Sequence, residues 1–265
     1  MLLTRILTAI IGIPFICVCT YYGGNLFYVM MFAVSTLCVK EYLSISKKYN
    51  PHATISLIIS VILFMLMWFF KNFSLNKMGI YAVLIMLVFF GIELFNGHPN
   101  LCINRISSSF LGAFFIPLTM IYMAYIRDLD KGMEFTFFIF IIVWCLDTAA
   151  YAFGKFFGRH KLLKNVSPQK TVEGAVAGTI FGIFVAIICR SMFMSKFLTL
   201  KNSIALGTVI ILISQFSDLA ESLIKRDSDV KDSGKIMPGH GGVFDRFDSY
   251  MFMAPVVYYI LEFLR

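Results

Sequence analysis

Charged residues are scarce in this chain. Only 14% of its 265 residues are Asp, Glu, Lys or Arg, whereas 59% are hydrophobic, and the mean hydropathy is +0.81. Soluble domains carry charge on about a quarter of their residues, so this composition excludes a soluble fold and leaves no stretch for a separate soluble domain. The sequence therefore predicts an all-α, polytopic integral membrane protein.

Two other classes of protein lack their usual patterns here. The cysteines have neither the CxxC nor the Cys/His spacing of a zinc site, and they fall within or beside apolar runs, where we expect them to fill the core. They are Cys17, Cys19, Cys38, Cys102, Cys145 and Cys189. The net charge of +8 is spread through loops and forms no basic stripe with stacking aromatics. This distribution argues against nucleic acid and favours anionic membrane lipids as partners.

Apolar runs of about 17–25 residues recur along the whole chain, and each is long enough to cross a bilayer as a helix. The first run follows Arg5 and has no small-x-small cleavage site after it, so we expect a membrane anchor rather than a cleaved signal peptide. Nine transmembrane helices are predicted, at about 6–22, 25–43, 54–70, 78–95, 107–126, 134–154, 174–191, 203–224 and 249–264.

The positions of Lys and Arg predict the orientation of these helices. With the N-terminus in the cytoplasm, the loops at 1–5, 40–53, 96–105, 155–173 and 225–248 hold fifteen of the 23 basic residues. Cytoplasmic loops of membrane proteins are enriched in Lys and Arg, which favours this orientation. The two most basic loops then share the cytoplasmic face, where nucleotides are available.

The penultimate predicted helix ends in a polar stripe. Ser214, Asp218, Glu221, Ser222 and Lys225 lie within one helix face about 100° wide. The stripe descends into the bilayer, so it must face protein, water or metal. A buried hydrogen-bond seam between helices is one interpretation, but a lone carboxylate such as Asp218 is costly in hydrocarbon and favours a functional site.

The last predicted helix opens with glycines followed by two acids. Asp245 and Asp248 are three residues apart and share a face if the helix begins near Gly242. The glycines before them leave backbone N–H groups that could cradle phosphate oxygens. A capped and solvated helix start would have a similar sequence, so the pattern alone leaves both interpretations open.

Convergence of the acids would require a cation. Two negative charges about 4 Å apart repel by roughly 4 kcal/mol at an effective dielectric near 20. If Asp218, Asp245 and Asp248 meet, a divalent ion between them is expected, and an all-oxygen ligand set favours Mg²⁺ over zinc. His240 is then interpreted as a phosphate contact or a loop hydrogen-bond partner rather than a metal ligand.

A second polar element begins inside the sixth predicted helix. Asp147, Tyr151 and Lys155 follow a spacing of four residues, so they share one helix face that runs into the basic loop 155–173. That face could line the same cavity. The segment 167–174 predicts a turn, a helix cap and a short basic element, with a plain interfacial loop as the alternative.

Three short patterns stand in order near the C-terminus: SxxKR at 222–226, KD at 231–232 and HGGxxDRxD at 240–248. Their order and spacing resemble the signature of the phosphatidate cytidylyltransferases, also called CDP-diacylglycerol synthases. Segments 147–158 and 167–174 also resemble that family. The resemblance is firm over about 140–265, whereas the first 130 residues match mainly in hydropathy.

The chain departs from the family pattern at three positions. Gln169 stands where a second Lys is common, Val172 where an aromatic is common, and Met237 where Leu or Ile is usual. None of the three is a proposed ligand. The missing cation at 169 puts in question how this loop would hold a triphosphate.

The resemblance implies transfer of CMP from CTP to phosphatidic acid, with Mg²⁺ and a second cation that could be monovalent, such as K⁺. It also implies a homodimer and a multi-pass protein of the bacterial inner membrane whose active site faces the cytoplasm. We expect catalytic roles for Lys225, Arg226, Asp245, Arg246 and Asp248, and metal binding by Asp218, Asp245 and Asp248. Substrate binding is expected from Asp147, Tyr151, Lys170, Ser222, Lys225, Arg226, Lys231, Asp232, His240, Gly241 and Gly242.

These expectations divide the chain into two regions. Residues 1–130 would form a transmembrane scaffold that could also dimerise, and 131–265 the catalytic region. Two alternatives stay open at this point. A CTP-dependent lipid kinase would use similar charges, and a cation- or proton-coupled transporter would use Asp147 and Asp218, although no inverted repeat is visible.

Overall fold

The computed structural model describes residues 2–70, 75–97, 99–237, 239 and 241–263, and most of these are helical. The helices are α1 (Leu2–Tyr22), α2 (Gly24–Ile45), η1 (Ser46–Tyr49), α3 (Ala53–Phe69), α4 (Leu75–Asn96), α5 (Cys102–Phe110), η2 (Leu111–Phe115), α6 (Ile116–Asp128), α7 (Gly132–Phe157), α8 (Val172–Cys189), η3 (Arg190–Met194), α9 (Leu200–Asp227) and α10 (Phe244–Phe263). Helices α5, η2 and α6 run on without a break. A two-stranded antiparallel hairpin, β1 (Lys161–Leu163) and β2 (Ser167–Thr171), precedes α8.

The helices confirm an all-α, multi-pass membrane protein. Among the described residues, six helical segments are long and apolar enough to cross a membrane: Gly24–Tyr49, Met78–Asn96, Cys102–Asp128, Gly132–Phe157, Val172–Met194 and Leu200–Asp227. Two shorter apolar helices cover Ile10–Tyr22 and Ala53–Phe69. Each predicted apolar run falls on a helix, while the count of nine spans and the cytoplasmic N-terminus stay predictions.

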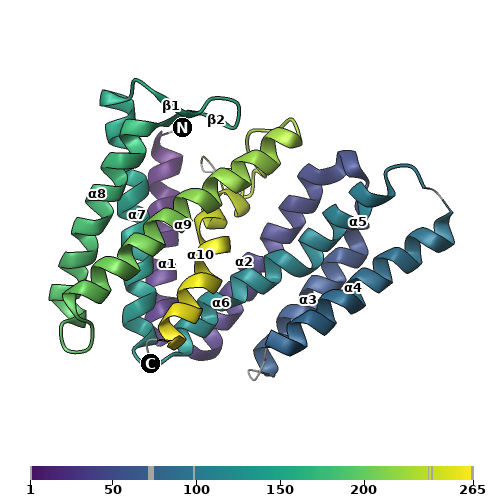
Figure 1. Ribbon diagram of the computed structural model, residues 1–265, viewed down its shortest axis with the longest axis horizontal. Helices are drawn as coiled ribbons and strands as arrows, with labels where there is room; N and C mark the ends of the chain where they lie inside the picture. The colour runs from purple at the N-terminus through teal and green to yellow at the C-terminus, as the bar shows by residue number, and fades with distance from the viewer. Residues whose placement is uncertain (1, 71–74, 98, 238, 240, 264–265) are drawn as a thin grey trace.

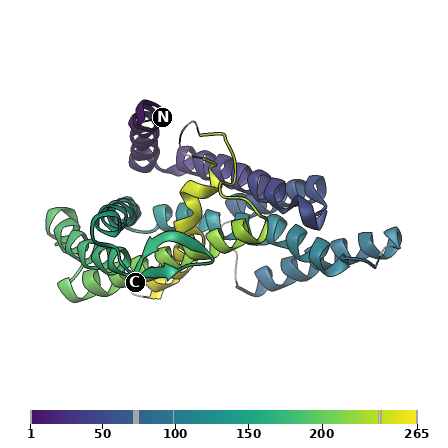
Figure 2. The same cartoon turned by 90° about the horizontal axis from the view of Figure 1, so that it is seen from above.

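Helix α10 lies in the middle of the molecule, where it packs against α9, α6 and α2 (Figure 1). Helices α7, α8 and α9 form one side, and α3, α4 and α5 form the other. Figure 2 shows α1 to one side of the remaining helices, where it contacts α2 and α7. The first half of the chain therefore packs directly against the helix that carries the DxxD pair.

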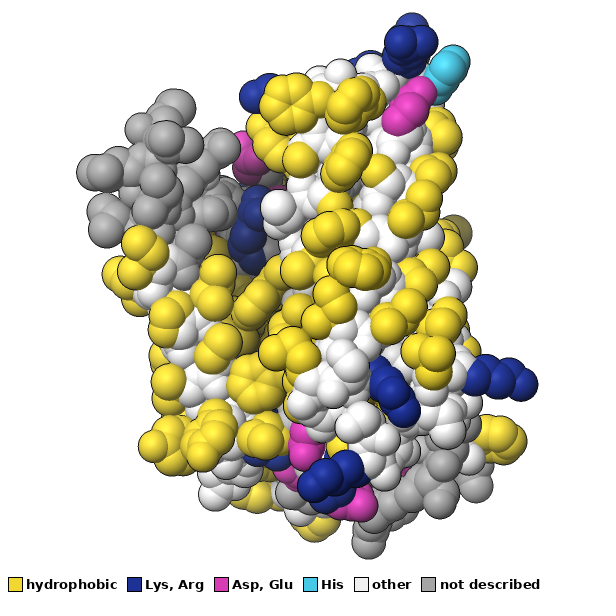
Figure 3. Space-filling view, turned by 90° about the vertical axis from the view of Figure 1, so that its left-hand side faces the viewer, with side chains coloured by type: hydrophobic (Ala, Val, Ile, Leu, Met, Phe, Trp, Pro, Cys, Tyr) yellow, Lys and Arg dark blue, Asp and Glu magenta, His cyan; other side chains and the backbone are white. Residues whose placement is uncertain are grey.

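The outer face of α7 and α8 is apolar. Phe153 and Phe156 of α7 and Val176, Ile180 and Phe184 of α8 are all exposed. Hydrophobic side chains cover this side of the molecule, and charged side chains gather mainly towards its two ends (Figure 3). An apolar belt between charged ends is what a bilayer requires of the surface it contacts.

Glycines bring α7 and α8 into close contact. A Cβ on Gly174 would lie 2.6 Å from the carbonyl oxygen of Ala150, and one on Gly178 would lie 3.0 Å from that of Leu146. Small residues at a spacing of four allow helix backbones to approach in membranes. The start of α8 is capped as the sequence predicts, because the Thr171 hydroxyl accepts a hydrogen bond from the Gly174 N–H at 3.1 Å.

Candidate active site

The predicted polar stripe of α9 faces the protein interior. Ser214 and Glu221 are fully buried and Ser222 is nearly so. At the end of the stripe, the ammonium group of Lys225 lies 2.7 Å from Oε2 of Glu221 and 2.8 Å from Oδ1 of Asp245. One lysine thus neutralises a carboxylate of its own helix and one at the start of α10.

Asp245 also organises the loop before α10. Its carboxylate accepts backbone N–H hydrogen bonds from Ser233 at 3.0 Å and from Gly242 at 2.8 Å. The sequence predicts free N–H groups for phosphate at these glycines. In this arrangement the N–H of Gly242 is bound to the carboxylate of Asp245, and phosphate binding there stays a prediction. The short reach from the second residue of the helix back to the preceding loop makes this bond possible.

Asp248 lies among other acids. It is buried at 9% exposure, and its Oδ1 accepts a hydrogen bond from the adjacent Ser249 N–H at 2.6 Å. Asp147, Asp218 and Glu221 are all close enough to interact electrostatically with it. The backbone carbonyl of Asp248 accepts a hydrogen bond from Ser217, which fixes α10 against α9.

The acids Asp147, Asp218, Glu221, Asp245 and Asp248 form one acid cluster, and the β1–β2 hairpin reaches it. Lys170, on β2, forms an ion pair with Asp218 of α9. The Arg226 guanidinium donates to the carbonyl oxygens of Val166 at 3.1 Å and Val230 at 3.0 Å, so it ties the hairpin to the loop after α9. The two basic loops that the sequence places on one face do meet at the end of α9.

The α7 residues contribute unequally. Asp147 is exposed at its surface yet lies within electrostatic reach of Asp218, Lys170 and Arg246. Tyr151 shares its helix face and is 71% exposed. The structure therefore brings Asp147 to the acid cluster, as the sequence suggests, and leaves Tyr151 on the open surface.

The remaining predicted residues lie in the loop before α10. Lys231 and Asp232 are exposed, and a Cβ on Gly241 would lie 3.8 Å from that of Asp232. Gly241 has a φ of 85°, a backbone conformation that favours glycine. His240 lies outside the described residues.

The donor set of the cluster suits a hard divalent cation. Both carboxylate oxygens of Glu221 are buried, and the partner of Oε2 is the ammonium group of Lys225 at 2.7 Å. In this arrangement no three described His, Cys, Asp or Glu side chains are close enough to enclose an ion. Acids nevertheless outnumber cations here, with Asp147, Asp218, Glu221, Asp245 and Asp248 facing Lys170, Lys225 and Arg246. Oxygen ligands with surplus negative charge fit Mg²⁺.

Sequence reasoning missed two residues that connect the loop before α10 to its surroundings. Glu41 of α2 is buried and accepts hydrogen bonds from the Ser233 hydroxyl at 3.0 Å and the Phe244 N–H at 2.9 Å. An acid within an apolar run is a recognisable signal for a functional position. Ser233 carries no comparable signal, because a serine in a polar loop is unremarkable in sequence.

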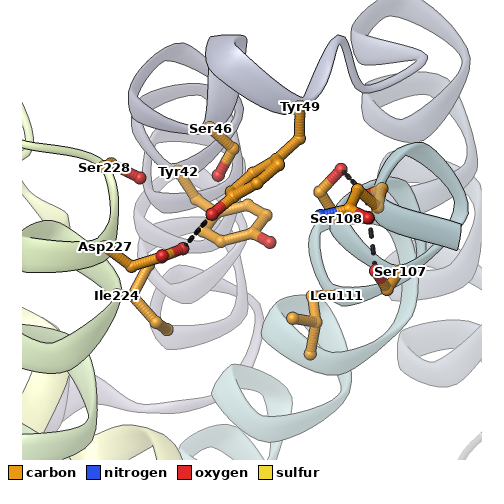
Figure 4. Close-up of a pocket in the computed structure, with 10 residues that line it drawn as sticks. Tyr42, Ser46, Tyr49, Ser107, Ser108, Leu111, Ile224, Asp227 and Ser228 are labelled. Carbon is orange, nitrogen blue, oxygen red and sulfur yellow. Dashed lines mark hydrogen bonds between the residues drawn. The ribbon is translucent and has the colours of Figure 1, made fainter. Parts of the chain in front are cut away.

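A cavity of about 240 Å³ lies on another side of α9, next to α2, η1 and α5 (Figure 4). Asp227 lines it and accepts a hydrogen bond from the Tyr49 hydroxyl, with Lys48 at 3.4 Å. Among the described residues, the lining includes none of the predicted site residues. Residues 225 and 227 point to different faces of a helix, so the cavity is distinct from the acid cluster.

Comparison with known proteins identifies relatives along the whole chain. A profile of the cytidylyltransferase family matches residues 3–264. A phosphatidate cytidylyltransferase of Bacillus subtilis is 31% identical over 268 residues, which cover 98% of this chain and 96% of that protein. Enzymes of the same name from Staphylococcus epidermidis and Staphylococcus aureus are 39% identical over 158 and 160 residues, respectively, covering 58% of this chain and 60% of each relative. These staphylococcal matches thus span less than two thirds of the length of the relatives. The family profile, in contrast, covers nearly the full chain, so this chain belongs to the cytidylyltransferase family.

Proposed function

We propose that this chain is a phosphatidate cytidylyltransferase, which transfers CMP from CTP to phosphatidic acid and forms CDP-diacylglycerol for phospholipid biosynthesis. The observation that carries the proposal is the buried meeting of α9 and α10, where Lys225 lies between Glu221 and Asp245, and Asp248 lies nearby. This cluster belongs to a multi-pass membrane protein whose relatives carry that name.

The reaction needs charge neutralisation more than proton transfer. A lipid phosphate is already an anion at neutral pH, so its oxygen can attack the α-phosphorus of CTP without a general base. A new phosphorus–oxygen bond forms while the bond from the α-phosphorus to the bridging oxygen breaks, and pyrophosphate leaves. Lys170, Lys225 and Arg246 would offset the repulsion between these anions.

Mg²⁺ is part of the proposal. Asp218 and Asp248, with Asp245 and Glu221 beside them, are the residues that would hold it. When bound, the ion would supply positive charge for the phosphate groups of both substrates. A second, monovalent cation such as K⁺ could share the surplus of carboxylates.

The site's position suits a lipid and a nucleotide that arrive from different phases. The polar stripe of α9 would receive the headgroup while the acyl chains stay in the bilayer, and CTP would enter from the cytoplasm beside the hairpin and the loop before α10. We further propose a homodimer in a bacterial inner membrane, with residues 1–130 as scaffold and dimer surface.

The test is an assay of the purified protein in detergent micelles with phosphatidic acid, CTP and Mg²⁺. We expect release of pyrophosphate together with a CDP-lipid. Release of CDP in the presence of a polyprenol acceptor would instead identify a lipid kinase. If neither reaction occurs although a thermal unfolding transition shows that the protein is folded, the proposed enzymatic function is rejected and a transporter is favoured.

A further inference from the structure

A buried acid of the first half of the chain holds the loop before α10. Glu41 lies near the end of α2 and is only 4% exposed. Its Oε2 accepts hydrogen bonds from the hydroxyl of Ser233 and the N–H of Phe244, residues about 200 positions away in the sequence. The acid therefore joins the first half of the chain to both ends of the loop 233–244.

Two glycines of this loop leave room for that carboxylate. A Cβ on Gly234 would lie 2.4 Å from Oε1 of Glu41, and one on Gly242 would lie 2.2 Å from Oε2. Real Cβ atoms do not approach other atoms so closely, so any side chain at either position would displace the acid or the loop. Gly242 thus has a spatial reason that does not involve phosphate.

Ser233 connects Glu41 to the active-site cluster. Its hydroxyl donates to Glu41, while its backbone N–H donates to Asp245, which in turn pairs with Lys225. Two carboxylates therefore hold the same serine from two sides. A displacement of the serine would change the hydrogen bonds that orient Asp245.

One oxygen of the Glu41 carboxyl group has no hydrogen-bond partner among the described residues. This oxygen, Oε1, is buried. Glu41, Glu221, Asp245 and Asp248 all lie within electrostatic reach of Cys38, so Glu41 is close to the acids of the active-site cluster. Buried carboxylate oxygens without a partner are rare, and such a group is typical of a site whose geometry matters for function.

We propose that Glu41 is a positioning residue that fixes the loop 233–244 and, through Ser233, the orientation of Asp245 and Lys225 for catalysis. The inference rests on the proposed function for its catalytic part. Its structural part, the attachment of the loop to α2, does not depend on which reaction the protein performs.

The first experiment measures the loop directly. Lys231 lies just before the loop and Lys235 lies within it, and both are exposed, so trypsin cleavage after these residues in micelles reports how firmly the loop is held. We expect Glu41→Leu to be cleaved at least about tenfold faster than the wild type, and Glu41→Gln to fall between them because its amide oxygen can keep an acceptor in place. Glu93→Gln is the matched control, since Glu93 is a buried acid of α4 that pairs with Arg105 away from the loop.

The second experiment separates positioning from substrate binding. Glu41→Leu should lower kcat by about 10- to 100-fold while the KM values for CTP and phosphatidic acid change less than about threefold, because the geometry of the reacting groups is lost rather than their binding surface. Glu41→Gln should restore most of kcat, and Glu93→Gln should leave it unchanged. A rise in KM alone, or equal losses in the Glu41 and Glu93 variants, would overturn the proposal.

Ser233→Ala keeps the proposal testable if Glu41→Leu does not fold. Removing this hydroxyl should also speed cleavage and lower kcat, and combining it with Glu41→Gln should add little, since both changes act on one hydrogen bond. Full additivity, or unchanged cleavage in Ser233→Ala, would reject the link. If the wild type lacks cytidylyltransferase activity, the proposed function fails, while the trypsin comparison still decides whether Glu41 holds the loop.

Discussion

The ammonium group of Lys225 lies 2.8 Å from Oδ1 of Asp245, and this ion pair joins the end of α9 to the start of α10. Glu221 shares the same ammonium group at 2.7 Å. Both acids are almost fully buried, so they depend on the lysine for compensation of their charge. Lys225 is therefore expected to contribute both to the stability of the fold and to the activity of the site.

The substitution Lys225→Met should lower both the stability and the activity of the protein. Breaking a buried pair leaves an uncompensated charge, so we expect a loss of about 3 kcal/mol in the free energy of unfolding. Activity should fall at least about 100-fold because a phosphate-neutralising cation is gone. Thermal unfolding in detergent and the pyrophosphate assay measure the two effects.

Lys48→Met provides the matched control. Lys48 of η1 pairs at 3.4 Å with Asp227 of α9, the helix that also carries Lys225, but both side chains of this pair are exposed. Exposed ion pairs contribute little to stability. The variant should therefore match the wild type in unfolding and turnover, and a loss like that of Lys225→Met would contradict a special role for the buried pair.

Asp248→Asn should separate stability from activity. Asp248 has three acids within electrostatic reach, so removing its charge should leave the protein as stable as the wild type or more stable. Activity should fall by at least about 100-fold if this carboxylate serves the metal. Asp245→Asn should instead lose both, because Asp245 accepts from Lys225 and from two backbone N–H groups. Identical behaviour of the two variants would show that the acids are not divided in this way.

The sequence predicts the helices and most of the cluster for a clear physical reason. Hydropathy sets the position of each span, and helical spacing alone places Asp218, Glu221 and Lys225 on one buried face of α9. Contacts between distant segments cannot be found in this way. The Lys170–Asp218 pair depends on how the hairpin folds over α9, and the Glu41–Ser233 bond depends on how α2 packs beside α10.

Close helix packing is a second feature that spacing only hints at. Gly174→Ala should destabilise the protein by about 1–3 kcal/mol, since the new methyl group would lie 2.6 Å from the Ala150 carbonyl oxygen and would push α8 from α7. Gly91→Ala in α4 is the control, because a Cβ there meets nothing within 4 Å. Alanine is also the better helix former, so Gly91→Ala should be neutral or stabilising in thermal unfolding. Equal destabilisation by the two changes would rule out the packing explanation.

Magnesium binding can be measured without turnover. A ligand that binds only the folded state stabilises it, by about 2.7 kcal/mol when its concentration is 100 times Kd. Mg²⁺ should therefore raise the unfolding temperature of the wild type in the absence of CTP and lipid, and removing it with a chelator should reverse the shift. The shift should be much smaller in Asp248→Asn and in Asp218→Asn, because each variant lacks one of the carboxylates that are proposed to hold the ion. Glu93→Gln, whose acid is neutralised by Arg105, should keep the full shift. A shift that survives in both aspartate variants would show that the ion binds elsewhere. The charge of the acid cluster would then be compensated by protein cations such as Lys170 and Lys225, without a metal.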